Sequence, residues 1–484
     1  MARASEPTRL LAGAAKVDIT HPEHPTRGER LYVKALALSD GSTKSIIVTL
    51  DAVAIGEIGP IRNDYLETVR TRLTNDFGIA AEHTLFNASH CHGLVCDDVA
   101  DKTVEAVRSA VAKLEPVKVA VGVGHENRIT ENRRLPLKDG RTADVRHAYS
   151  LPPDDQIAGL GPIDPAIGLV RLDRADGSTA AVLFQFACHP IQGVPAKTNT
   201  ADISGFAATV VEENLGPEAI ALFFQGCGGD INPVYYKDPD HPRDAESLGN
   251  LLGLSVLRGV REMKSSDAVE FNFTHRRVLL PRADLAPRIT RLEAEQNRLL
   301  QSLQGTSLNL KTFLPLAVKY QWSEEFPSYY ASRYLQDEAL GRDGQKKLDD
   351  ENRRNLAAYT KNILIMEELT RVQTNLALLK MHHKQNSEAA SRQIDTEMVG
   401  LRLGDFRLVT SPGELTVQIG LNIKRRSAHP LTFVSGYSNG YIYYTPTEEQ
   451  LANPGSAQED CDCLVAPGWQ SIFETAALEV IEKL

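Results

Sequence analysis

TLFNASHCHG, residues 84–93, joins a short apolar run to a polar turn that carries two histidines. The run Thr84–Phe86 predicts the end of a buried strand. Histidines two positions apart on an extended segment point to the same side, about 7 Å apart. His90 and His92 can therefore address one site, either as two metal ligands or as one ligand beside an acid/base group. Taken alone, such a pair is more often a packing or surface feature.

The same pattern, an apolar strand followed by a polar turn, recurs further along the chain. Residues 180–187 read AAVLFQFA before Cys188-His189-Pro190, and residues 219–225 read AIALFFQ before a glycine-rich stretch. Stretches with apolar residues at helical spacing lie between these strands. This order predicts an α/β fold with a mixed, largely buried sheet and flanking helices. Ligands bind at the carboxyl ends of strands in such folds, where the polar side chains are those of Asp51, His90, His92, His189 and Asp230.

Residues 285–395 differ in composition from the rest, because Glu, Gln, Lys, Arg and Leu dominate at helical spacing. We interpret this range as an α-helical insertion that serves as a lid or an oligomer surface. The predicted organisation is then an α/β catalytic core in two parts, residues 1–284 and 396–484, with the insertion between them.

Composition restricts the class of partner. The formal net charge of −10 argues against nucleic acid or an anionic membrane as the main partner. No apolar run reaches the roughly 18 residues that span a bilayer, so we expect no stable membrane insertion. Six cysteines in 484 residues do not form a disulfide framework, and residues 1–16 do not have the pattern of a secretory signal. We therefore expect a cytoplasmic protein with a small-molecule substrate, and a homo-oligomer stays open.

Five stretches, in this order, resemble the neutral (alkaline, non-lysosomal) ceramidase family: His90-Cys91-His92-Gly93, Ala187-Cys188-His189-Pro190, Gln225–Pro233, Pro412-Gly413-Glu414 and Asn439-Gly440-Tyr441. The resemblance implies a zinc ion held by four side chains, those of His90, His189, Glu414 and Tyr441. It implies that His92 lies beside the metal as an acid/base or oxyanion group. It also implies that Arg133 faces the polar head of the substrate.

The chain departs from the family pattern in three ways. Asn232 stands before Pro233 where the family usually has a serine that has been considered a nucleophile. An amide cannot take that role, so hydrolysis would proceed by attack of metal-bound water, with Asn232 as a hydrogen-bond donor. The chain also resembles only the N-terminal catalytic domain, as a short bacterial-type homologue would, and the helical insertion precedes Glu414.

Each of these residues also has a structural interpretation. His189 could cap a strand, and Glu414 after Pro-Gly could stabilise a helix N-terminus. Tyr441 lies in a tyrosine cluster that is by default packing. Asp51 and Asp230 could orient a ligand histidine or be turn residues.

The joint pattern favours a zinc-dependent hydrolase that cleaves an amide bond of a small N-acylated substrate. Two alternatives stay open. The same metal site could act on an ester, lactone or glycosidic bond, or the protein could be a catalytically silent metal- or ligand-binding homologue.

Overall fold

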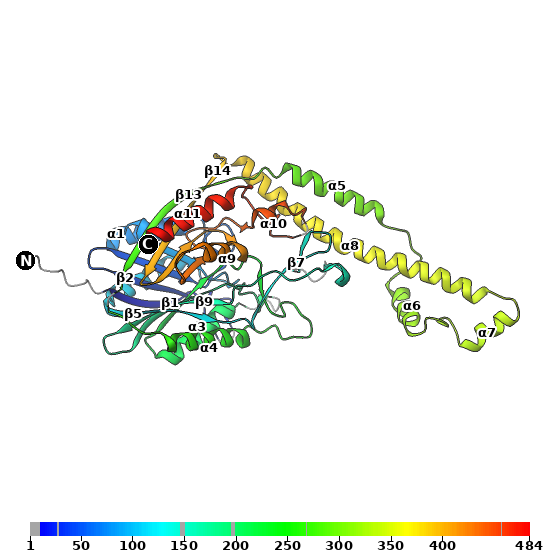
Figure 1. Cartoon of the computed structure of the whole chain (residues 1–484), viewed down its shortest axis with the longest axis horizontal. Coiled ribbons are helices and arrows are strands. Elements are labelled where there is room, and N and C mark those ends of the chain that lie inside the picture. The colour runs from blue at the N-terminus through cyan, green and yellow to red at the C-terminus, as the bar shows by residue number, and fades with distance from the viewer. Residues whose placement is uncertain (1–9, 27–28, 146–150, 195–198, 268, 456) are drawn as a thin grey trace, which may run out of the picture.

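The computed structural model describes residues 10–26, 29–145, 151–194, 199–267, 269–455 and 457–484. Its main feature is a mixed eight-stranded sheet (Figure 1). The strands lie in the order β11 (Ile220–Gln225), β10 (Thr179–Phe186), β9 (Ala166–Arg174), β5 (Glu115–His125), β1 (Leu11–Asp18), β2 (Tyr32–Ser39), β3 (Lys44–Leu50) and β4 (Thr84–Ala88). The pairs β3–β4 and β10–β11 are parallel, and the other pairs are antiparallel. The predicted mixed α/β class is confirmed.

A second sheet packs face to face against the first. It contains β13 (Phe271–Pro281), β14 (Gln393–Leu403), β15 (Phe406–Thr410) and β17 (Thr432–Ser435). Alternate residues of β14 and β15, such as Leu401 and Leu408, form one core with Leu36 and Leu222 of the first sheet. Because side chains alternate between the two faces of a strand, the intervening residues of both sheets point away from this shared core.

Helices cover the outer face of each sheet. The first sheet is covered by α1 (Tyr65–Phe77), α2 (Val99–Ala112), α3 (Asp202–Leu215) and α4 (Glu246–Glu262). The second is covered by α9 (Val417–Arg426) and α11 (Trp469–Lys483), whose Trp469 is fully buried. Most strands are thus buried on both faces, which explains their nearly continuous apolar sequences.

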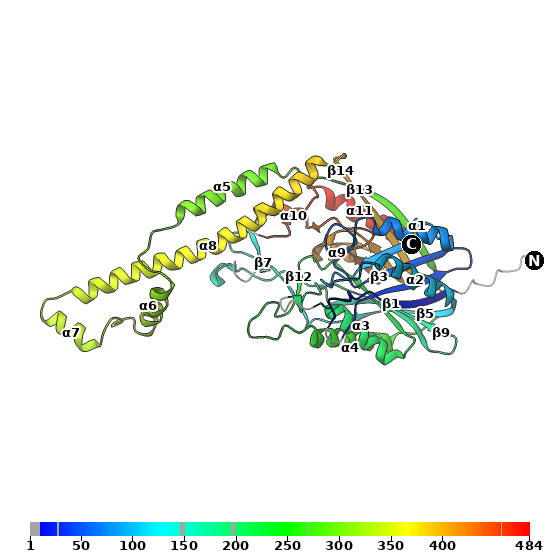
Figure 2. The same ribbon diagram turned by 180° about the vertical axis from the view of Figure 1, so that it is seen from behind.

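Between β13 and β14 the chain leaves this body and forms a long helical projection (Figures 1 and 2). We call it the arm: α5 (Ala286–Ser302), α6 (Leu310–Trp322), α7 (Ala331–Ala339) and α8 (Gly344–Glu388). Helix α8 has 45 residues and is therefore about 68 Å long. Leu292 and Leu299 of α5 pack against α8 at Leu376 and Leu379. The use of the arm as a lid or oligomer surface, and the division into domains, stay predictions.

Short elements gather at the carboxyl ends of the main strands. The short strands form three pairs: β6 (Thr130–Asn132) with β12 (Ile231–Pro233), β7 (Arg134–Pro136) with β8 (Thr142–Asp144), and β16 (Glu414–Leu415) with β18 (Tyr444–Thr445). Three short helices complete the set of described elements: η1 (Ala81–His83) precedes β4, η3 (Asp154–Gln156) follows β8, and α10 (Glu448–Ala452) follows β18. Among the predicted site residues, Asn232 lies on β12, Glu414 lies on β16, and Arg133 lies between β6 and β7.

Two expectations from composition can be compared with the structure. All six cysteines are buried and free of disulfides. Of the helices in the described ranges, none has both the length and the apolar character that crossing a bilayer requires. Residues 1–9 of the segment that we expect not to be a secretory signal lie outside the described residues.

Candidate metal centre

His90 follows β4, but not on an extended segment. The strand ends at Ala88, and His90 has a φ of 66°, in the left-handed region. The predicted extended pair of histidines is therefore wrong in its backbone. The turn leaves His90 buried and His92 exposed. Their rings still lie close, with centroids 5.5 Å apart.

The orientation of the His90 ring is fixed from the protein side. Its Nδ1 atom lies 2.6 Å from the carbonyl oxygen of Val53, so Nδ1–H donates to that oxygen. The neutral tautomer with a proton on Nδ1 leaves the Nε2 lone pair available. This arrangement, with a backbone carbonyl behind a histidine, is common for metal ligands.

His189 follows β10 and has the same kind of support. Its Nδ1 atom lies 2.6 Å from the carbonyl oxygen of Gly228, in the glycine-rich stretch after β11. Its backbone N–H donates to the carbonyl oxygen of Ile231. The parallel neighbours β10 and β11 thus bring their following turns together, and Nε2 of His189 points toward the same place as Nε2 of His90.

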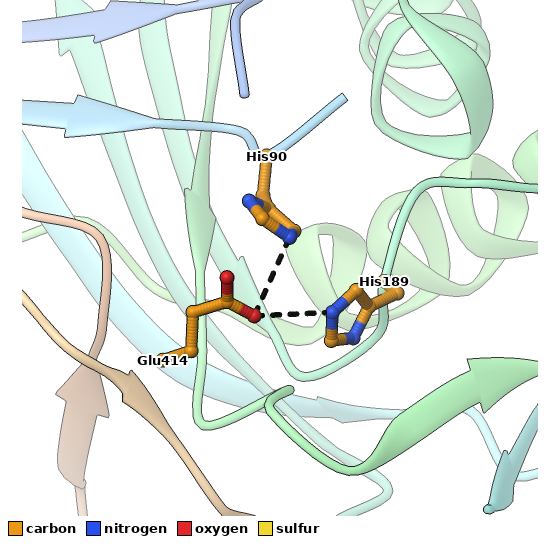
Figure 3. Close-up of side chains that lie close together, drawn as sticks. All are labelled: His90, His189 and Glu414. Carbon is orange, nitrogen blue, oxygen red and sulfur yellow. Dashed lines mark ion pairs between the residues drawn. The ribbon is translucent and has the colours of Figure 1, made fainter. Parts of the chain in front are cut away.

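Glu414, on β16, completes the group (Figure 3). Its Oε2 atom lies 3.5 Å from Nε2 of His90 and 3.3 Å from Nε2 of His189, and all three side chains are buried. Ligand atoms of a tetrahedral zinc ion, at about 2.0–2.1 Å from the metal, are about 3.3 Å from one another. One atom from each residue lies within 4.8 Å of the others. The three side chains therefore fit a divalent metal ion.

The protonation states also suit a metal. Burial lowers the pKa of His189 to about 3, and the charge of Arg133 acts in the same direction. The imidazole is therefore neutral at neutral pH. Burial alone would raise the pKa of Glu414, but His90, His189 and Tyr441 outweigh it and hold that pKa well below the usual range. A neutral imidazole and an ionised carboxylate are the forms that bind metals.

Tyr441 and Tyr437 contact the carboxylate of Glu414. The hydroxyl of Tyr441 donates to Oε1, and the hydroxyl of Tyr437 donates to Oε2 at 3.2 Å. Burial and the charge of Glu414 raise the pKa of both phenols. The structure thus brings Tyr441 to the centre, and its role as a fourth ligand stays a prediction, as does the acid/base role of His92.

The loop that carries these tyrosines has an unusual backbone. Tyr437, Asn439 and Tyr443 have φ values of 54°, 53° and 61°. Non-glycine residues in the left-handed region cost free energy and persist only where neighbours hold them. The side-chain amide of Asn87 in β4 donates to the carbonyl oxygen of Gly436 at 2.8 Å. The strand that leads to His90 therefore also holds the tyrosine loop.

Arg133 is fully buried beside the centre. Its guanidinium donates to the carbonyl oxygen of Gly229 at 2.6 Å and to the hydroxyl of Tyr444 at 3.1 Å. It also donates to Oδ1 of Asn232 at 3.2 Å. Protein groups thus surround Arg133, and Asn232 accepts a hydrogen bond here. The predicted contact of Arg133 with substrate, and a donor role for Asn232, stay predictions.

Tyr444 also lies at the centre, and it is a member of the tyrosine cluster for which the sequence alone favours packing. Its hydroxyl lies 3.4 Å from Nε2 of His189 and bonds to Arg133. Asp230 and Asp51 bond instead to backbone N–H groups, those of Val417 at 2.7 Å and Tyr32 at 2.8 Å. Asp230 thus holds the start of α9 and Asp51 holds the start of β2, so both aspartates tie distant segments of the chain together.

Comparisons with known proteins give a consistent result. No family model matches the chain. A neutral ceramidase from Mycobacterium tuberculosis (strain ATCC 25618 / H37Rv) is 23% identical over 478 residues, which cover 88% of this chain and 67% of that protein. The crystal structure of neutral ceramidase from Pseudomonas aeruginosa is similar with a TM-score of 0.61 at 17% identity, over 99% of this chain and 75% of that one. A ceramidase complexed with C2 gives a TM-score of 0.61 at 16% identity, over 99% and 76% of the two chains.

Proposed function

Because the chain is neutral ceramidase-like in sequence and in fold, we propose that it is a zinc-dependent hydrolase that cleaves an amide bond of a small N-acylated substrate. The observation that carries the proposal is the buried group of His90, His189 and Glu414, whose spacing and protonation states suit a divalent ion. Imidazole nitrogen together with carboxylate oxygen is a donor set typical of catalytic zinc. When bound, zinc would polarise the substrate carbonyl and activate water.

The protein side chains have separate tasks in this proposal. The carbonyl oxygens of Val53 and Gly228 accept hydrogen bonds from the Nδ1–H groups of His90 and His189 and so hold the two imidazoles in place. Tyr437 and Tyr441 hold the carboxylate of Glu414. These contacts keep the ligand atoms in place before substrate arrives, so the reaction does not have to order them.

Proton transfer and charge stabilisation fall to other residues. His92 is exposed, and its ring lies next to that of His90. Its imidazole nitrogen can accept the proton of the attacking water and return it to the leaving amine. The hydroxyl of Tyr444, close to His189, can donate to the oxygen that becomes negative in the transition state. Arg133 holds that hydroxyl in place.

The test measures amine release from zinc-loaded protein. The panel contains N-acyl amines, N-acyl amino acids, N-acyl amino sugars and a short-chain ceramide, with matched esters, lactones and glycosides in parallel. Glu414→Gln should abolish turnover. His241→Ala removes a half-exposed histidine that pairs with Asp238 and serves as the control that should keep full activity.

The outcomes separate the alternatives. Amine release that is lost in Glu414→Gln supports the proposal. Turnover of esters, lactones or glycosides alone would move the activity to another bond at the same site. No turnover of any substrate by fully zinc-loaded protein would overturn the proposal and favour a catalytically silent binding protein.

A further inference from the structure

Two buried acidic residues lie directly behind Arg133. Glu459 and Asp460 are both fully buried, as are Arg133 and, almost completely, Arg134. Oε1 of Glu459 lies 2.7 Å from Nε of Arg133, and the two carboxylate oxygens of Asp460 lie 2.8 and 3.1 Å from Arg134. Two positive and two negative groups therefore form one compact cluster without net charge.

This cluster connects to the metal centre through Arg133. Nη2 of the Arg133 guanidinium donates to the carbonyl oxygen of Gly229 and to the hydroxyl of Tyr444. That hydroxyl lies 3.4 Å from Nε2 of His189. The contact between Glu459 and Arg133 is a close ion pair, not an aligned hydrogen bond. Its main contribution is therefore charge, and charge acts strongly where water is excluded.

The segment that carries Glu459 is held by the arm. Asn375 of α8 donates to the carbonyl oxygen of Gly455 at 2.7 Å, and His382 of α8 lies 2.7 Å from the carboxylate of Asp462. Arg288 of α5 donates to the carbonyl oxygen of Asp460. The arm thus fixes the chain on both sides of Glu459, and the carboxylate cannot follow Arg133 if that side chain moves.

We propose that Glu459 is a positioning residue for the metal centre. Its carboxylate neutralises Arg133 and keeps the guanidinium of Arg133 against Gly229 and Tyr444. The proposal rests on the proposed function, in that the centre binds zinc. Without the negative charge of Glu459, the positive charge of Arg133 beside the ligands is uncompensated. Binding of a divalent cation then becomes weaker, because like charges repel across a medium of low dielectric.

The experiment compares zinc affinity in three variants of the full chain by competition with a chromophoric chelator. Glu459→Gln keeps the size of the side chain and removes its charge. Glu459→Asp keeps the charge. Glu212→Gln is the matched control, because Glu212 is also a buried carboxylate held by two cations, Lys16 and Lys34. Melting temperatures measured without zinc report the purely structural cost of each change.

The expected result is zinc affinity at least tenfold weaker in Glu459→Gln, restored to within about threefold of wild type in Glu459→Asp and unchanged in Glu212→Gln. Wild-type affinity in Glu459→Gln, or an equal loss in Glu212→Gln, would overturn the positioning role. A wild-type chain that binds no zinc would refute the proposed function instead. A crystal structure of metal-free Glu459→Gln then decides: a displaced Arg133 guanidinium supports the role, and an unmoved one overturns it.

Discussion

Gly229→Ala should disable the metal centre without touching any ligand side chain. A Cβ atom at this position would lie 2.6 Å from the backbone oxygen of Glu414 and 2.9 Å from that of Leu415. Ordinary contact begins at about 3.4 Å, and both atoms belong to backbone, which cannot rotate away. The strand β16 must therefore move by roughly 0.8 Å (3.4 − 2.6). Metal–ligand distances tolerate only about 0.2 Å, so we expect zinc affinity to fall at least tenfold.

The assay is zinc affinity at neutral pH by chelator competition, with circular dichroism to verify the fold. Gly305→Ala is the control, because a Cβ atom at Gly305 meets nothing within 4 Å. Zinc binding by Gly229→Ala equal to that of wild type, in a protein with native circular dichroism, would refute the placement of Glu414 as a ligand.

Three further predictions concern stability and turnover. Burial alone would raise the pKa of Glu397, but His275 and Arg70 lower it from 4.5 to about 2. The ionised carboxylate therefore stabilises the fold above pH 4.5, and this stabilisation is lost as the pH falls toward 2. Glu397→Gln should lower the free energy of unfolding by roughly 3 kcal/mol at pH 7 and by clearly less at pH 3; a difference independent of pH in urea titrations would contradict this. Leu379→Ala, at a fully buried position between α5 and α8, should cost about 2–5 kcal/mol in the same titrations, and a cost under about 1 kcal/mol would contradict the packing of the arm. Tyr444→Phe should lower kcat at least about tenfold while zinc affinity stays that of wild type, and full kcat would remove Tyr444 from the proposed reaction.

The fold class was predictable because burial on both faces leaves a strong signal. Strands such as β10 and β11 are continuous apolar runs between amphipathic helices. The second sheet has a weaker signal, since most of β13 is only half buried. Helix α6 lies within the range that we expected to be helical, and it continues through Pro315, a residue that normally ends a helix.

The three residues of the candidate centre were predictable, but their surroundings were not. His90 and His189 follow buried strands, at the carboxyl ends where α/β folds place their sites, whereas Glu414 was expected from the family resemblance. The left-handed backbone of His90 was not predictable, because few residues other than glycine adopt it and nothing in the local sequence requires it. Glu459 could not be assigned either, since it lies more than 300 positions from its partner Arg133 and only the folded chain brings them together.

The most direct measurement of the central claim is anomalous X-ray scattering at the zinc edge from crystals of the zinc-loaded protein. We expect one strong peak per chain, about 2.0–2.2 Å from Nε2 of His90, Nε2 of His189 and an oxygen of Glu414. The same peak should be absent from crystals of Glu414→Gln. A zinc peak at some other place in the chain, or none within reach of these three side chains, would contradict the metal centre and the hydrolase proposed from it.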